Sequence, residues 1–106
     1  MITAFITFKL PDGTSREDIM QAFRTSVEQL RGHPGLIRKH YLYNPEEGVA
    51  AGAYLWESRA AADALYTAEW REMITQRYGS EPSISWFETP FVLDNVTGKV
   101  TVEAAA

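Results

Sequence analysis

The order of strand-like and helix-like segments, separated by turns rich in glycine and proline, most restricts what this chain can fold into. Apolar and polar residues alternate over residues 2–9, which is typical of a strand with one buried face. A helix follows to about Arg31, because apolar side chains recur there at a 3.6-residue spacing. It begins after Thr14 or Ser15, each of which has an acidic residue three positions later, as a helix cap requires.

The rest of the chain contains two strands, a helical region and a further strand. Residues 36–43 and 49–56 are predicted strands joined by a short polar loop, which favours antiparallel pairing. Helical stretches over 59–66 and 68–78 follow, with a bend expected at Thr67. A fourth strand covers 84–89 and is interrupted by Pro90. We expect 91–93 to continue the fourth strand after that break.

The resulting order, βαββαβ, predicts an α+β fold. With right-handed crossovers it closes as a ferredoxin-like sandwich, a four-stranded antiparallel sheet with two helices on one face. The length of 106 residues is that of one domain. We place this domain at 1–99 and a C-terminal tail at 100–106. Residues 94–106 are expected either to form an arm packed on a partner or to be disordered.

The face of the sheet without helices has too many apolar residues to remain in water. Phe5, Leu55 and Phe87 lie in strands whose other face is also apolar. A large uncovered apolar face marks an interface, and two such sheets packed face to face in a symmetric pair would cover it. We therefore expect a homodimer.

Composition excludes several classes of protein. The absence of cysteine excludes a disulfide scaffold and thiol catalysis, and the net charge of −4 disfavours nucleic acid as a partner. The apolar start of the chain is too short for a signal peptide or a membrane span, so no membrane association is expected and a cytoplasmic location is the default. No phosphate-binding loop or G-x-S-x-G motif occurs. Two histidines without an acid at ligand spacing predict no metal site.

Several segments carry a likeness to known proteins. They are Pro34-Gly35-Leu36, Ala51-Gly52-Ala53-Tyr54-Leu55-Trp56, the alanine-rich helix after Ser58, Trp86-Phe87-Glu88 and Leu93-Asp94-Asn95-Val96-Thr97. Over residues 2–99 the chain resembles the dimeric α+β barrel superfamily and, within it, the YdhR-like group of putative mono-oxygenases. These segments are signatures of a fold rather than of catalytic chemistry.

The resemblance implies a cofactor-independent mono-oxygenase that acts on a small aromatic or quinone-type metabolite. The haem-degrading branch of the superfamily is disfavoured, because its histidine ligand late in the second helix is replaced here by Met73-Ile74-Thr75. An isomerase on the same scaffold, a non-catalytic dimer that binds a small hydrophobic molecule, and an assembly domain whose aromatic residues only fill the core remain as alternatives.

Candidate site residues follow from the chemistry of such an oxygenation, which needs an apolar pocket, a base and a group that holds the substrate anion. His40 is the candidate base, since an imidazole titrates near neutral pH. Arg38 is expected on the same strand face, together with Leu36 and Leu42, and would hold the anion. The candidate substrate-binding residues are aromatic, and we expect them between the sheet and the second helix: Tyr54, Trp56, Tyr66, Trp70 and Phe87, with Trp86 nearby. No cofactor is expected.

Overall fold

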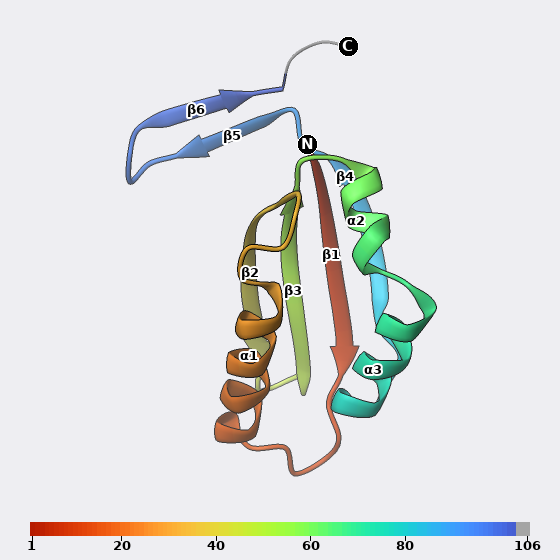
Figure 1. Cartoon of the computed structure of the whole chain (residues 1–106). Helices are drawn as coiled ribbons and strands as arrows, with labels where there is room; N and C mark the ends of the chain where they lie inside the picture. Colours follow the sequence, from red (N-terminus) through yellow and green to blue (C-terminus); the bar gives the residue numbers. More distant parts are fainter. Residues whose placement is uncertain (104–106) are drawn as a thin grey trace.

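The computed structural model describes residues 1–103 and contains nine elements (Figure 1). In chain order they are β1 (Ile2–Lys9), α1 (Arg16–Leu30), β2 (Leu36–Asn44), β3 (Val49–Trp56), α2 (Arg59–Leu65), α3 (Ala68–Tyr78), β4 (Ser83–Glu88), β5 (Phe91–Asp94) and β6 (Lys99–Val102). Within residues 1–103, no helix is both long and apolar enough to cross a membrane.

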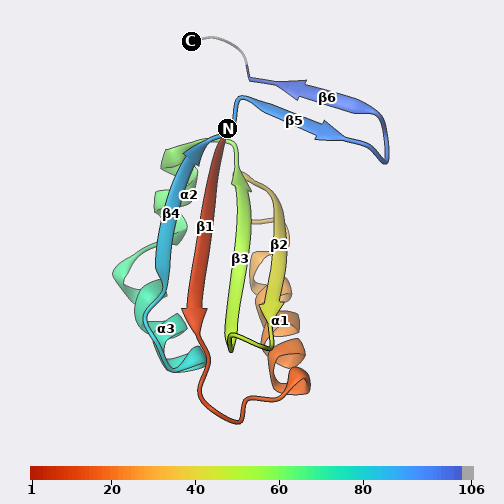
Figure 2. The ribbon, with the colours of Figure 1, turned by 180° about the vertical axis from the view of Figure 1, so that it is seen from behind.

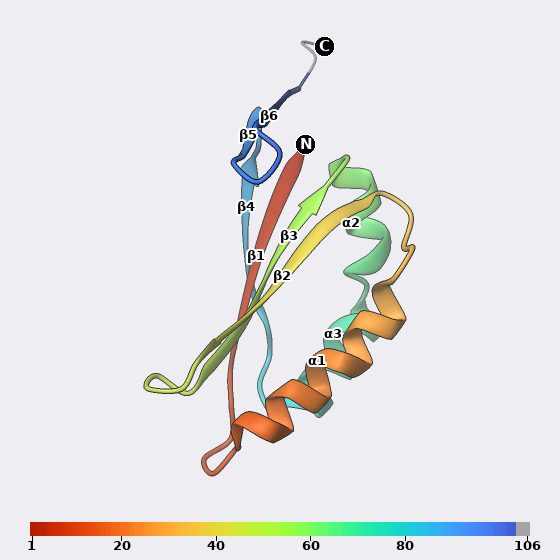
Figure 3. The same ribbon diagram turned by 90° about the vertical axis from the view of Figure 1, so that its left-hand side faces the viewer.

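Four strands form an antiparallel sheet in the order β2-β3-β1-β4, with β1 and β3 in the centre. All three helices lie on one face of this sheet, as the side view shows (Figure 3). Seen from behind, the strands lie in front of the helices, and no helix of residues 1–103 covers this side of the sheet (Figure 2). The predicted ferredoxin-like α+β sandwich is therefore confirmed. We call the two sides of the sheet the helix face and the open face.

The residue just before each helix caps it with its side chain. Ser15 accepts a hydrogen bond from the Asp18 backbone N–H, and the Asp18 carboxylate accepts one from the Ser15 N–H, so of the two predicted starts the second is correct. Ser58 caps α2 in the same way. The Thr67 hydroxyl accepts from the Trp70 N–H and starts α3, which confirms the predicted bend.

The core lies between the sheet and the helices. Its largest fully buried side chains are those of Trp56, Ile6 and Ile19. The pairing of β1 with β3 places the bulky Ile6 opposite Gly52, which has no side chain. The glycine leaves room on the helix face for the long side chains of neighbouring residues.

An irregularity in β2 changes which residues share a face. The register of β2 against β3 shifts between Leu36 and Arg38. Leu36 packs against the core, whereas Arg38 and His40 follow on the open face with Leu42. The expectation that Leu36 shares a face with Arg38 is wrong. The extra residue of a bulge breaks the alternation, so that the side chains before and after it point to opposite faces of the sheet.

The C-terminal region forms a hairpin, which we call the arm (residues 91–102). Strand β5 pairs with β6 in a separate two-stranded sheet rather than extending β4, so the predicted continuation of the fourth strand is wrong. Pro90 has no N–H to donate, and the chain turns away from the main sheet there (Figure 1). The tail boundary predicted after residue 99 falls within β6. Residues 104–106 of that tail lie outside the described residues.

The arm is joined to the sheet by several polar contacts. The Arg38 guanidinium lies 3.9 Å from the Asp94 carboxylate, and just before the arm the hydroxyl group of Thr89 is hydrogen-bonded to that of Thr3. Just after the arm, the carboxylate of Glu103 pairs with the N-terminal ammonium group of Met1. These contacts hold the arm above one end of the open face.

Candidate functional site

A cavity of about 270 Å³ lies on the helix face, between the sheet and helices α1 and α3. Its walls come from α1 (Ser26, Gln29, Leu30), β3 (Tyr54), α2 (Leu65) and α3 (Trp70, Met73, Ile74, Arg77). Most of these side chains are apolar or aromatic, and a few polar groups converge among them. This composition is typical of a site for a small, largely apolar ligand.

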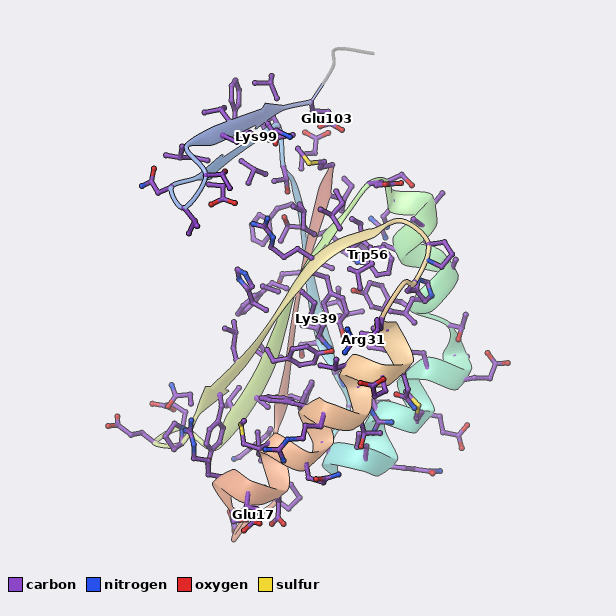
Figure 4. The ribbon with its side chains drawn as sticks, turned by 60° about the vertical axis from the view of Figure 1, so that its left-hand side comes forward. Glu17, Arg31, Lys39, Trp56, Lys99 and Glu103 are labelled. Carbon is purple, nitrogen blue, oxygen red and sulfur yellow. The ribbon has the colours of Figure 1, made fainter. Side chains whose placement is uncertain are left out.

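Lys39 lies beside this cavity, on the helix face of β2. It is paired in register with Tyr54 of β3. Its Nζ donates a hydrogen bond to Ser26 Oγ at 3.2 Å, and it lies 3.9 Å from the ring centroid of Tyr41 and 4.3 Å from that of Tyr54. Figure 4 shows Lys39 pointing from the sheet into the space beneath α1. The ammonium group is therefore surrounded by aromatic faces and one hydroxyl group.

Gly52 makes this arrangement possible. A Cβ atom at residue 52 would lie 2.8 Å from Tyr54 Cε1 and 2.9 Å from Lys39 Cε. The side chains of Lys39 and Tyr54 thus occupy the space that any other residue would fill. The backbone of Gly52 does not have a positive φ angle, so the requirement for glycine here is one of space alone.

The surroundings change the pKa values of the groups in this cluster. Burial disfavours the ammonium form of Lys39, the Arg77 guanidinium adds like-charge repulsion, and together they lower its pKa to about 7. Burial raises the pKa of Tyr54 well above its usual value, with a smaller contribution from neighbouring Tyr66. It also raises the pKa of Tyr41, which the hydrogen bond from Ser26 partly offsets. At neutral pH the tyrosines are uncharged and Lys39 is close to half protonated.

Arg77 gives the cavity a fixed positive charge. It lies in the last turn of α3, and its guanidinium donates to Gln29 Oε1 at 3.0 Å and contacts the Met73 sulfur at 3.7 Å. No carboxylate forms an ion pair with Arg77 or Lys39 within residues 1–103. An anionic group of a ligand in the cavity would find no competing negative charge.

The predicted aromatic residues divide into three groups. Tyr54 and Trp70 line the cavity. Trp56 and Tyr66 pack behind them: Trp56 Nε1 donates to the Tyr66 hydroxyl at 3.0 Å, and the rings of Tyr66 and Trp70 are 4.7 Å apart. Phe87 lies on the open face and is 58% exposed. The structure therefore brings four of the five predicted substrate-binding residues together and separates the fifth.

The predicted base and anion holder lie on the opposite side of the sheet from these aromatic residues. His40 and Arg38 line a separate, open recess of about 360 Å³ between the open face and the arm, with Thr3, Leu55 and Phe91 among its other walls. Neither residue can contact a ligand in the helix-face cavity of the same chain, because the sheet lies between them. The single site expected from the sequence is thus two sites in the structure.

Sequence reasoning missed Lys39, Ser26 and Arg77. The signal for Lys39 was present, because residue 39 alternates with Arg38 and His40 and so shares a strand face with Tyr41. A lysine on the face that the helices cover is a departure from the usual exposure of this residue. Nothing in the sequence placed Ser26 or Arg77 beside it. Among residues 1–103, no cluster of three histidine, aspartate or glutamate side chains is placed to hold a metal ion.

Comparison with known proteins identifies the family to which the chain belongs. The family model described as "Putative mono-oxygenase ydhR" matches residues 5–86, which is most of the chain. The chain therefore belongs to the YdhR family of putative mono-oxygenases. A search of curated protein sequences gives no significant match.

Solved structures of similar fold carry related descriptions. One is a putative antibiotic biosynthesis monooxygenase from Nitrosomonas europaea, with a TM-score of 0.65, 18% identity, and coverage of 84% of this chain and 98% of the other. SnoaB, a cofactor-independent oxygenase from Streptomyces nogalater, has a TM-score of 0.64 and 15% identity, with 87% and 95% covered. The monooxygenase of Streptomyces coelicolor ActVA-Orf6, in complex with nanaomycin D, has a TM-score of 0.63 and 21% identity, with 83% and 86% covered. At these identities the likeness establishes the fold.

Proposed function

We propose that this protein is a mono-oxygenase that oxidises a small phenolic aromatic or quinone-type compound in the helix-face cavity, without a metal or bound cofactor. The observation that supports this most directly is the cavity itself, whose wall combines Tyr54 and Trp70 with the charged Arg77. A flat aromatic ligand would pack against the first two residues. Family membership and the fold of the similar solved structures agree with this class of reaction.

The reaction proposed is oxidation of a phenol by dioxygen. A phenol with an unsubstituted para carbon gives a quinone: one oxygen atom replaces hydrogen at that carbon, the other leaves as water, and the substrate supplies all four electrons. The ionised phenol is the better electron donor, so the protein's contribution is to stabilise the anion and exclude bulk water. Arg77 is placed to hold the phenolate oxygen.

The test is oxygen consumption by the purified protein with a panel of dihydroxynaphthalenes and anthrone-type compounds. Arg77→Gln should lower kcat/KM by about 10²-fold or more, the size of effect expected for one anion-stabilising group. Arg71→Gln, on the same helix but exposed, is the matched control and should leave kcat/KM within about twofold. Binding of these compounds without oxygen consumption would instead support the non-catalytic binding protein.

The open-face recess is a second location for the chemistry, because it contains His40 and Arg38 side by side. His40→Ala decides between the two faces. A loss of turnover in His40→Ala, with normal turnover in Arg77→Gln, would move the reaction to the recess and contradict the proposal made here.

We also propose that two copies pack their open faces together. Phe5, Leu42 and Phe87 are exposed on that face, and the arm adds exposed Phe91 and Leu93 beside it. Covering these side chains would remove a contiguous apolar surface from water. Light scattering after size-exclusion chromatography should give twice the mass of the chain. Leu42→Lys should shift the protein towards the monomer, whereas a wild-type monomer at micromolar concentration would refute the proposal.

A further inference from the structure

Lys39 differs from the other two lysines of the chain. Lys9 and Lys99 are exposed, whereas the ammonium group of Lys39 lies beneath helix α1. Its only hydrogen-bond partner among residues 1–103 is Ser26 Oγ, and the rings of Tyr41 and Tyr54 flank it. Lys39 is half-buried and its ammonium group has no carboxylate partner among residues 1–103, an arrangement that is costly to the fold and is typical of functional sites.

Ser26 connects Lys39 to the cavity. Its hydroxyl oxygen lies 3.2 Å from Lys39 Nζ and 2.9 Å from the Tyr41 hydroxyl, and the residue is itself buried in the cavity wall. A ligand hydroxyl group at Ser26 would therefore be two hydrogen bonds from the lysine nitrogen. A hydroxyl group can accept one proton while it donates its own, so Ser26 can relay a proton between the ligand and Lys39.

Four groups face Lys39 from the elements packed against it, and one of them, the Arg77 guanidinium, disfavours its charged form together with burial. They are Tyr41 on its own strand, Tyr54 from β3, Ser26 from α1 and the Arg77 guanidinium from α3. None of these groups is negatively charged at neutral pH. Near pH 7 about half of the lysines would be neutral amines, and a neutral amine has the lone pair that accepts a proton.

We propose that Lys39 is the proton acceptor of this site, taking the phenolic proton of the substrate through Ser26. The inference rests on the proposed function. The substrate O–H bond breaks, Ser26 Oγ takes that proton, and the original hydroxyl proton of Ser26 passes to Lys39 Nζ. A neutral phenol and a neutral amine become a phenolate and an ammonium group, with no change in oxidation state. The phenolate then lies between Arg77 and the protonated Lys39.

This arrangement selects the ligand by its acidity. Binding as a phenolate returns a negative charge to a cavity that otherwise contains only positive ones, so the phenolate also stabilises the ammonium form of Lys39. Phenols that ionise close to neutral pH should transfer the proton readily. Aromatic ligands of the same shape without a hydroxyl group should bind more weakly and take up or release no proton on binding.

The first test is an NMR titration of the full-length protein with ¹³C-labelled lysine. Only three lysines are present, so the signals are readily assigned by the Lys9→Arg and Lys99→Arg variants. Lys39 should titrate near pH 7, well below the usual lysine value of about 10.4. Titration of the Lys39 signal above pH 10 would overturn the proposal.

The second test uses turnover against pH. For the wild-type protein, kcat/KM should rise about tenfold per pH unit below pH 7 and level off above it, since the neutral amine is the active form. In Lys39→Met this rise of kcat/KM with pH should disappear, and kcat/KM should be lower by about 10²-fold or more. Lys39→Arg should be equally impaired, because arginine stays protonated. Lys99→Met is the control and should behave as wild type, whereas persistence of the rise with pH in Lys39→Met would overturn the proposal.

A third measurement separates failure of this inference from failure of the proposed function. 4-Nitrophenol, whose ionised form absorbs visible light, reports its own protonation state when bound. At pH 6 the wild-type protein should bind it as the phenolate, and Lys39→Met should bind it as the phenol. That result would support the proton transfer even in a protein that oxidises none of the compounds tested. Equal ionisation in the two proteins, or no binding, would overturn the inference whatever the outcome for turnover.

Discussion

The two faces of the sheet use the same strands for opposite purposes. On the helix face, Trp56 and Ile6 are fully buried, and Lys39 is enclosed between tyrosine rings. On the open face, Phe5 and Phe87 are exposed, and His40 and Arg38 lie in an open recess. Successive residues of one strand thus lie in environments that differ in solvent exposure and in the cost of holding a charge.

This difference determines what each titratable side chain can do. Lys39 and Arg38 are adjacent cations, yet burial and the Arg77 charge lower the pKa of Lys39 to about 7, whereas Arg38 pairs with Asp94 on the surface. A basic side chain near water keeps its ordinary charge. One moved beneath the helices becomes a group that titrates at neutral pH and is therefore suited to proton transfer.

The largest expected contrast between the faces is in stability. Trp56→Ala should lower the free energy of unfolding by about 3–5 kcal/mol, because it leaves a cavity and removes the hydrogen bond to Tyr66. Phe87→Ala should lower it by no more than about 0.5 kcal/mol in a single chain, since that ring is already exposed. Urea unfolding at several protein concentrations measures both. A loss in Phe87→Ala that grows with protein concentration would show that a second copy covers the open face.

A smaller effect is expected at Lys39, where a substitution should raise the free energy of unfolding instead of lowering it. Lys39→Met should raise the free energy of unfolding by about 1–3 kcal/mol at pH 7, because it removes the cost of burying an amine whose pKa is lowered. The unfolded wild-type chain binds a proton that the folded chain has lost between about pH 7 and pH 10.5, so wild-type stability should rise with pH there. The difference between the two proteins should narrow over the same interval. Equal pH dependence in both proteins would contradict a lowered pKa for Lys39.

The smallest effect is expected at Gly52. Gly52→Ala should lower the free energy of unfolding by about 1 kcal/mol, because the ends of the Tyr54 and Lys39 side chains must shift to admit a methyl group. The same shift should return the pKa of Lys39 towards 10.5, which lysine NMR would detect. Ala53→Ser, one residue away on the open face, is the control and should change neither quantity. An unaltered Lys39 titration in Gly52→Ala would show that the glycine is not what admits the lysine.

Elements that depend on local pattern could be predicted closely. Strand β3 and helix α3 begin and end at the predicted residues, and Ser15, Ser58 and Thr67 cap helices as their positions indicated. The arm was missed, because its two strands pair only with each other and each has four residues. The bulge near Leu36 was also missed. Both depend on how strands pair rather than on the pattern within one strand.

The sequence by itself determined the βαββαβ order, the apolar open face and the aromatic residues of the site, because strand alternation, helical spacing and caps are properties of neighbouring residues. Only the tertiary structure decided that His40 and the aromatic cluster lie on opposite sides of the sheet, and that Lys39 meets Ser26, Tyr54 and Arg77. The physical reason is that the pKa and contacts of a side chain depend on what folds across from it. For Lys39, that is an absent side chain at Gly52 and a helix turn 13 residues earlier in the chain.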